Sequence, residues 1–508
     1  MGTPHVSNPD VSDPDATGSR GERRDADAPP VAELRHHPPD LDPALVGPRA
    51  YASRRRRHLL DAASALGLAA ALAVLVPGHL VLPGLGGLGR PVTVFGVALA
   101  VCWFATRLHP HLITPGPQPL RWAAAAYLGT ILAAYAAGFL RPLTVEEATA
   151  ADRAVVTYVV YVAVALVCAD GIASRARLDD LVRTLVALGV VMALIGHVQV
   201  AFGVNLVERI RIPGLVDHRE AVEFRARGDG LFQVASTALH YIEFSTVMAL
   251  LVPFAIHAAR HARTGTGRTA AAVGAVLLAA AVPVSLSRTG MVGLAVGLLV
   301  LSACWNWRTR YAVGMLGCGL LAVLMVARPG LLGTLRSIFV HAADDPSVQG
   351  RTEDYGPAFA YIAERPLLGR GPGTFLPTLY RYIDNDWLVH LITVGVVGTA
   401  AYAAWHVTAL TLAVIAYRRS EREVDRHLCA CLIAAQATAV VVAALFDAMA
   451  FTTHTLVLSI LTGAAGAMWR FTHPSRRVRT AHPGSGPTAG RVRPRAGRRG
   501  RTARPATG

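Results

Sequence analysis

Long apolar runs alternate with short polar segments along most of this 508-residue chain. About 20 apolar residues are enough for a helix to cross the hydrocarbon core of a bilayer. Helices are expected because backbone amides that face lipid must be satisfied within their own segment. The pattern therefore predicts an all-α integral membrane protein with about 12 transmembrane helices. The predicted spans lie near residues 59–78, 91–107, 121–140, 154–173, 183–203, 236–258, 268–286, 288–305, 311–327, 389–416, 427–447 and 452–471.

The composition agrees with a membrane protein. Charged residues make up only 16% of the chain, whereas about 25% is usual in a soluble protein. Residues 1–53 are rich in Pro, Asp, Ser and Ala, and residues 474–508 hold ten arginines and no acidic residue. We expect both segments to be disordered tails. The basic C-terminal tail is expected to touch anionic lipid headgroups rather than nucleic acid. The polytopic membrane domain is then expected at residues 54–473.

Basic residues gather in alternate loops, and this distribution predicts the orientation. Examples are "RRRRH" at 54–58, "SRARLDDLVR" at 174–183 and "RRSEREVDR" at 418–426. Basic loops face the cytoplasm, so an even number of spans places both termini there. Residues 204–235 and 328–386 become outer loops. The chain has no lysine and many Ala, Arg and Gly residues, which is typical of a GC-rich bacterial genome. A bacterial cytoplasmic membrane is therefore the predicted location.

The six cysteines lie in or at the ends of apolar spans, without the spacing of zinc ligands. We therefore predict no disulfide, no metal site and no cofactor. The cysteines are Cys102, Cys168, Cys304, Cys318, Cys429 and Cys431.

The outer loop 328–386 is too long for a simple connection, and loops of this length are usually functional or disordered. Residues 331–342 and 356–364 have apolar positions at helical spacing, which predicts two short amphipathic helices at the membrane interface. The segment "RPLLGRGPGTF" at 365–375 follows them. It lacks the dinucleotide-binding pattern, so we interpret it as a shaped turn. A ligand contact by its amides or by Arg370 is the other interpretation.

Several arginines lie on the predicted outer face, where topology does not require them. Arg225 and Arg227 precede a span, and Arg288 occupies the short turn "SLSRTG" at 285–290. For each arginine alone, extension to the lipid headgroups is a sufficient explanation. Together they favour an anion site, because guanidinium groups keep their charge and donate hydrogen bonds in a fork that suits diphosphate.

Three segments in this order resemble the O-antigen ligase and O-antigen polymerase superfamily: "SLSRTG", then "GRTEDYGPAFAYIAERPLLGRGPGTF", then "DNDWLVHLITVGVVG". The resemblance is specific over about residues 285–400. It implies a membrane glycosyltransferase that moves a glycan from a polyprenyl diphosphate carrier to an acceptor hydroxyl at the outer face of the cytoplasmic membrane. The acceptor is a glycan or a lipid. The resemblance further implies chemistry without a metal, in the synthesis of a cell-surface polysaccharide. Because diphosphate is a good leaving group, a single base would suffice, and inversion at the anomeric carbon would follow.

The resemblance also implies site residues. Gly350 and Arg351 match the Gly-Arg that opens the large outer loop of the family, and either Arg225 or Arg227 matches the arginine of the earlier loop. We expect Arg351 to hold the diphosphate with one of these arginines and with Arg288. The chain departs from the family at Asp384, where a histidine is frequent, so Asp384 is the expected base or acceptor-orienting group. The residues in reserve for this role are Glu353, Asp354 and His390.

Two other functions remain open. A transporter or flippase for a lipid-linked glycan would need charged or broken helices at midplane in paired halves, and His240, Glu243 and Asp447 are its best candidates. A structural membrane scaffold would leave the outer arginines without a role. Ligase and polymerase differ in their acceptor, which the sequence does not disclose.

Overall fold

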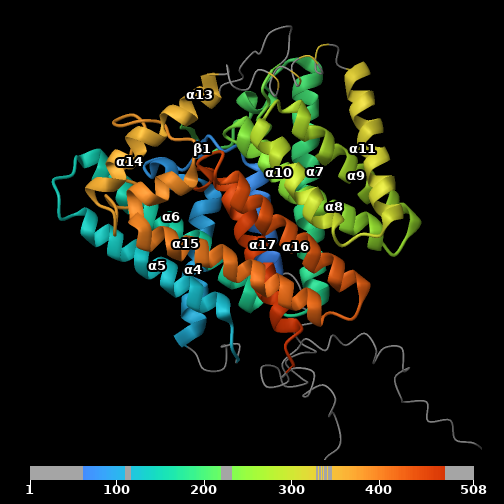
Figure 1. Cartoon of the computed structure of the whole chain (residues 1–508), viewed down its shortest axis with the longest axis horizontal. Coiled ribbons are helices and arrows are strands. Elements are labelled where there is room, and N and C mark those ends of the chain that lie inside the picture. Colours follow the sequence, from blue (N-terminus) through green and yellow to red (C-terminus); the bar gives the residue numbers. More distant parts are fainter. Residues whose placement is uncertain are drawn as a thin grey trace, which may run out of the picture. The chain divides into compact units, whose positions relative to one another are not determined.

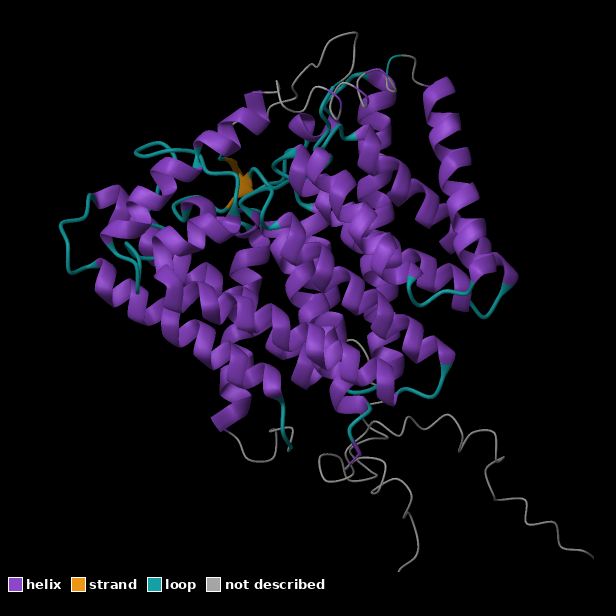
Figure 2. Cartoon of the chain, viewed as in Figure 1, coloured by secondary structure: helices purple, strands orange, loops and turns teal. Residues whose placement is uncertain are grey.

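The computed structural model describes residues 61–108, 116–218, 232–327 and 346–474, with four single positions between 330 and 340. Both predicted tails, the predicted helix at 331–342 and the two arginines Arg225 and Arg227 lie outside the described residues, except for isolated positions. Within the described residues the fold is almost entirely helical, with one pair of very short strands (Figure 2). The helices are α3 (Ala62–Leu75), α4 (Pro91–Leu108), α5 (Pro119–Gly138), α6 (Val145–Gly171), α7 (Arg175–Phe202), α8 (Tyr241–His261), α9 (Gly265–Val284), α10 (Arg288–Ser302), α11 (Trp307–Ala327), α13 (Pro346–Glu353), α14 (Tyr355–Glu364), α15 (Asp386–Arg419), α16 (Glu423–Val442) and α17 (Thr452–Phe471), with 3₁₀ turns η2 (Gly86–Gly89), η3 (Leu206–Arg209) and η5 (Ala448–Ala450) (Figure 1).

Every predicted span coincides with one of these helices. Eight helices in the described residues are long and apolar enough to cross a membrane, and α3 and α10 are shorter apolar helices. The class, an all-α membrane protein, is therefore confirmed, while the number of spans stays a prediction. In the outer loop, α14 forms where an amphipathic helix was predicted, and α13 precedes it without having been predicted.

α17 has the most enclosed position. Every one of its residues from Thr452 to Phe471 is buried, and the helix packs against α6, α15 and α16, among others. A helix without lipid-facing positions tolerates polar side chains if neighbouring helices satisfy them. This explains why α17 carries several threonines and still lies in the interior: Thr453 donates to the Ala73 carbonyl, and Thr462 accepts from Gln436.

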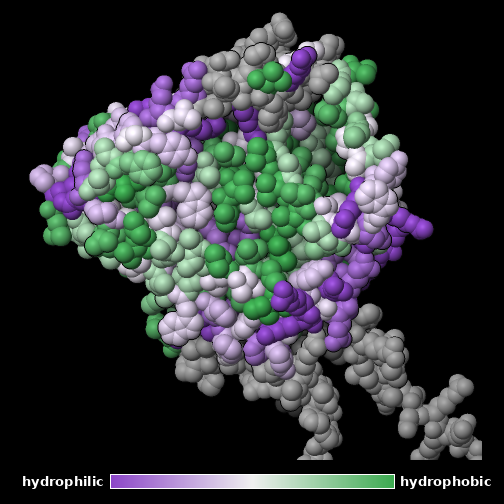
Figure 3. Space-filling model, viewed as in Figure 1, coloured by the Kyte–Doolittle hydropathy of each residue, from purple (hydrophilic) through white to green (hydrophobic). Residues whose placement is uncertain are grey.

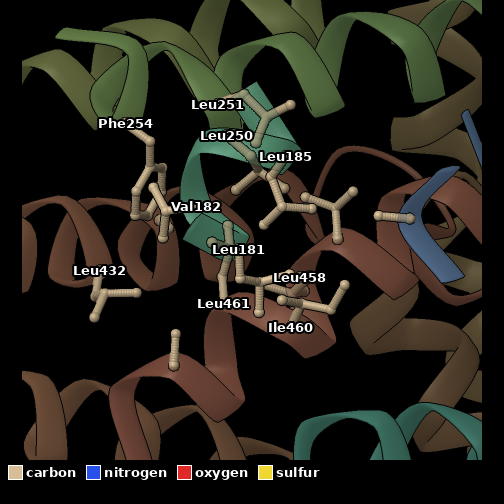
Figure 4. Packing of buried hydrophobic residues seen from close by; sticks show 14 of the residues in the cluster. Leu181, Val182, Leu185, Leu250, Leu251, Phe254, Leu432, Leu458, Ile460 and Leu461 are labelled. Carbon is tan, nitrogen blue, oxygen red and sulfur yellow. The ribbon is translucent and has the colours of Figure 1, made fainter. Parts of the chain in front are cut away.

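The interior is built from leucines, valines and alanines contributed by several helices. Leu185 of α7, Leu250 and Phe254 of α8, Leu432 of α16 and Leu461 of α17 belong to one buried cluster (Figure 4). In contrast, Figure 3 shows apolar side chains over a broad part of one outer face. Large apolar residues on several helices are more than half exposed, which suits a surface in contact with lipid. Examples are Phe104 (63%), Leu299 (72%), Val323 (64%) and Val407 (60%).

Local sequence signals determine where α6 begins and where α15 is interrupted. The Thr144 side chain accepts from the Glu147 amide, and Glu147 accepts from the Thr144 amide, which forms a capping box at the start of α6. The strands β1 (Leu80–Val81) and β2 (Val216–Asp217) pair antiparallel and join two loops far apart in sequence. α15 contains a break at Gly395, whose φ of 67° and ψ of −172° are open essentially only to glycine.

Candidate active site

The turn "SLSRTG" between α9 and α10 has strained and tightly packed backbone. Leu286 has a φ of 58°, in the left-handed region that is costly for a leucine. Ser287 is the N-cap of α10, and its Oγ accepts from the Gly290 amide at 3.2 Å. A Cβ on Gly290 would lie 2.4 Å from the Cβ of Ser245, so α10 and α8 approach each other closely here. Strain of this kind is often stored at functional sites.

This turn lines a cleft together with the beginning of α8 and with α13. The side chains of Arg288 and Arg351 both line this cleft. The first turn of α10 adds the positive end of a helix dipole at the same place. The two arginines were predicted to bind one diphosphate, and the structure places them in one cleft. The other lining residues are Gln233, Tyr241, Ile242, Leu286, Ser287 and Thr289.

Arg351 also forms an ion pair with Asp384. The Arg351 Nη2 atom lies 3.4 Å from the Asp384 Oδ2 atom, and the Asp384 side chain is 51% exposed. The Nε atom of Arg351 is buried and has no hydrogen-bond partner among the described residues. The guanidinium therefore retains donors for a further acceptor in the cleft. The two residues expected to perform the chemistry are in contact.

The three residues held in reserve for the role of base lie outside the arginine cleft. Glu353 is exposed on α13, and Asp354 is buried and accepts from Arg381 Nε at 2.5 Å. His390 is fully buried, with its Nε2 atom 3.0 Å from the Tyr127 hydroxyl. Neither Glu353, Asp354 nor His390 lines the cleft of Arg288 and Arg351.

Arg370 holds the loop together instead of lining this cleft. Its guanidinium donates to Glu364 at 2.5 Å and to the Tyr380 hydroxyl at 3.0 Å. It also lies over the rings of Tyr361 and Tyr380, 5.4 and 4.8 Å from their centroids. Tyr380 in turn donates to Glu147 at 2.7 Å. These contacts attach the turn to the start of α6.

The glycine-rich turn closes the break in α15. The amides of Arg370 and Gly371 donate to the carbonyls of Ile392 and Thr393, both at 2.9 Å. In return the Val396 amide donates to the Pro366 carbonyl at 2.8 Å. Backbone groups that the break at Gly395 would leave unpaired are therefore satisfied by the turn, which agrees with its interpretation as a shaped turn.

A buried polar network lies beneath Asp384, and the sequence analysis missed most of it. Asp386 is fully buried and accepts from the Tyr402 hydroxyl at 2.8 Å. Asp386 also shares a hydrogen bond with Asp447, in the connection between α16 and α17. Burial raises the pKa of Asp447 well above its usual range, and the charge of Asp386 raises it further. The available signal was the tripeptide Asp384–Asn385–Asp386, in which Asn385 caps α15 and turns the second aspartate inward.

His240 and Glu243, which were considered as transport residues, each accept hydrogen bonds at the start of a helix. The His240 Nδ1 atom accepts from the Ile242 amide at 3.3 Å, at the start of α8. The Glu243 carboxylate accepts from the Thr453 amide at 2.7 Å and from the Leu239 amide at 2.9 Å. A buried carboxylate with two backbone donors has a structural reason to be where it is.

Comparison with known proteins identifies this region. Residues 273–403 match the model of the family described as O-antigen ligase. This part of the chain is similar to O-antigen ligases. The match covers about a quarter of the chain and contains Arg288, Arg351 and Asp384. The predicted resemblance is thus confirmed. No curated protein matches the chain.

The match, in an all-α membrane protein, supports a membrane enzyme of glycan processing in general. The family match implies a lipid-linked glycan and an acceptor in a membrane as substrates. The transporter or flippase is not favoured by this match.

Proposed function

We propose that this protein transfers or polymerises a glycan from a polyprenyl diphosphate donor onto an acceptor hydroxyl, at the outer face of a bacterial cytoplasmic membrane. The observation that carries the proposal is the cleft in which Arg288 and Arg351 meet the start of α10. Both termini lie in the cytoplasm in this proposal, and the loop 328–386 lies outside.

The cleft suits the charge that develops during transfer. When the bond between the sugar and its diphosphate breaks, the leaving phosphate oxygen takes the electron pair. Prepositioned cations stabilise that charge in the transition state more than in the bound donor. We assign this role to Arg288 and Arg351, and we assign the third contact to Arg225 or Arg227. The positive charge comes from side chains in this mechanism, without a metal ion.

Asp384 then acts as the base. In the structure it neutralises Arg351 at 3.4 Å. A bound diphosphate competes for the same guanidinium, which releases the carboxylate toward the acceptor. The acceptor oxygen forms a bond to the anomeric carbon, its proton goes to Asp384, and the diphosphate leaves from the opposite side. A single displacement of this kind inverts the anomeric configuration.

The acceptor decides between the two activities of the superfamily. Transfer to a different lipid or glycan makes a ligase, and transfer to another copy of the same lipid-linked glycan makes a polymerase. The family match is to O-antigen ligase.

Reconstitution in proteoliposomes tests the proposal. The donor is an oligosaccharide on polyprenyl diphosphate, and the matched control is the same oligosaccharide on polyprenyl monophosphate. We expect a new glycosidic bond from the diphosphate donor only, detected by mass spectrometry. Movement of the intact donor across the bilayer without a new bond would instead show a flippase.

A further inference from the structure

Three histidines from two helices face one another at the end of α8 that is remote from the arginine cleft. His257 and His261 lie one turn apart on α8, and His427 lies on α16. The ring centroids are 5.0, 5.2 and 5.3 Å apart. One ligand atom from each imidazole can be chosen so that all three lie within 4.8 Å of one another.

A cysteine lies beside this group, with its thiol donating to the Pro253 carbonyl at 3.2 Å. Cys431 follows His427 by one helical turn, and its Sγ atom lies 3.6 Å from the His427 Nδ1 atom. The His257 and His427 Nδ1 atoms are 3.1 Å apart. A tetrahedral zinc ion, with bonds of about 2.0–2.1 Å to nitrogen and about 2.3 Å to sulfur, separates two nitrogens by about 3.3 Å and nitrogen from sulfur by about 3.5 Å. Both distances are already close to those values.

The hydrogen bonding of the group is incomplete. The Nε2 atom of His261 is buried and has no hydrogen-bond partner among the described residues. A buried polar atom without a partner is costly, and a metal–nitrogen bond would remove that cost. The nearest guanidinium groups are balanced by acids, since Arg260 pairs with Glu423 at 2.7 Å and Arg175 with Asp425 at 2.9 Å.

We propose that His257, His261, His427 and Cys431 bind zinc or another borderline divalent transition metal. This set of nitrogen and sulfur ligands is typical of such ions. The site joins α8 to α16, about 22 Å along α8 from Ile242 in the arginine cleft. The metal therefore has a structural role, and this inference does not depend on the proposed glycan transfer.

Trp305 competes with the metal for His427. Its indole donates to the His427 Nε2 atom at 3.1 Å, and an indole nitrogen can only donate. The neutral imidazole of His427 therefore carries its hydrogen on Nδ1 in this structure. A metal on Nδ1 moves that hydrogen to Nε2, where it faces the indole N–H. Metal binding must therefore break the contact with Trp305.

Titration of the metal-free, tag-free full chain with Zn²⁺ tests the site, and Co²⁺ serves as a spectroscopic probe. We expect the intense visible absorption of tetrahedral cobalt with a thiolate ligand, a change in tryptophan fluorescence, and a higher melting temperature with zinc. His261→Ala should weaken this binding at least about tenfold, and Cys431→Ser should remove the thiolate signal. His218→Ala changes an exposed histidine outside the group, and it should bind zinc like the unmodified chain.

The contact between the Trp305 indole and His427 predicts a variant that binds zinc more tightly. Trp305→Phe removes the competing donor, so it should bind zinc about two- to tenfold more tightly. Equal zinc affinity in the unmodified chain, His261→Ala and Cys431→Ser would overturn the proposal. So would octahedral cobalt spectra without a thiolate signal.

Discussion

Asp384 and Asp386 lie two residues apart and have opposite surroundings. Asp384 is half exposed and pairs with Arg351, whereas Asp386 is fully buried and accepts from Tyr402. Exposure next to the arginine cleft leaves Asp384 able to meet an acceptor. Because Asp386 is buried and hydrogen-bonded to Tyr402, it stabilises the start of α15. At the residue scale the two aspartates should therefore respond differently to the same substitution.

Asp384→Asn should reduce transfer about a hundredfold or more, because the loss of a general base typically costs that much. Its melting temperature should stay close to that of the unmodified protein, since the Asp384 side chain is 51% exposed and its ion pair with Arg351 contributes little. Transfer per folded molecule is the measurement. Glu353→Gln, on an exposed acid of α13, is the matched control and should keep its activity. If Asp384→Asn loses only thermal stability, Asp384 stabilises the loop and takes no part in the reaction.

Asp447 gives a prediction on pH. Its pKa is raised in the folded state, so the folded protein holds this proton at pH values where the unfolded chain has lost it. Its contribution to stability therefore falls as pH rises from about 4 toward the raised pKa. Asp447→Asn cannot ionise and keeps a donor for Asp386, so the melting temperature should depend less on pH. Parallel curves for the two proteins between about pH 5 and 9 would contradict this assignment.

At the scale of elements, the break in α15 depends on Gly395. A Cβ at this position would lie 2.3 Å from the Leu367 carbonyl oxygen, and its backbone is costly for any other residue. Gly395→Ala should therefore destabilise the outer turn by at least about 1–2 kcal/mol, with a lower melting temperature and reduced transfer. Gly129→Ala, on α5 with open space around it, should not lower the melting temperature. Equal stability of the two variants would show that the break is not required.

The helices could be predicted from the sequence, but this break could not. Apolar runs of membrane-spanning length gave the position of each long helix to within several residues. The segment "TVGVVG" continues such a run without a charged residue. The partners of its backbone are Pro366, Leu367 and Gly371, which precede it by more than 20 residues. Only the tertiary structure shows that the shaped turn and the break satisfy each other.

At the scale of the whole molecule, the arginine loops predict the topology. A reporter fused near residue 345 should be active outside the cytoplasmic membrane, and one fused after residue 475 should be active in the cytoplasm. The reason is that the basic loops alternate, which places an even number of spans between the two termini. An inside signal near residue 345 would put the arginine cleft on the wrong face for the proposed reaction.

The arginine cleft could be predicted only in part from the sequence. Arg288 and Arg351 are far apart in sequence, and the family resemblance together with their predicted outer position brought them into one hypothesis. Arg370 follows Arg351 in the same loop, among conspicuous glycines, yet its partners are Glu364 and Tyr380. The group of His257, His261, His427 and Cys431 was missed because its two pairs lie on helices about 170 residues apart. Each pair alone has only the spacing of one helical turn.

The most direct test of the account compares Arg351→Lys with Arg351→Ala. A guanidinium holds diphosphate through a fork that lysine cannot reproduce. We therefore expect both variants to lose about a hundredfold or more of their transfer from a polyprenyl diphosphate donor. Arg381→Lys, in the same loop and paired with Asp354, should keep its activity. Near-normal transfer by Arg351→Lys would contradict the account, because it would reduce Arg351 to the partner of Asp384 in an exposed ion pair.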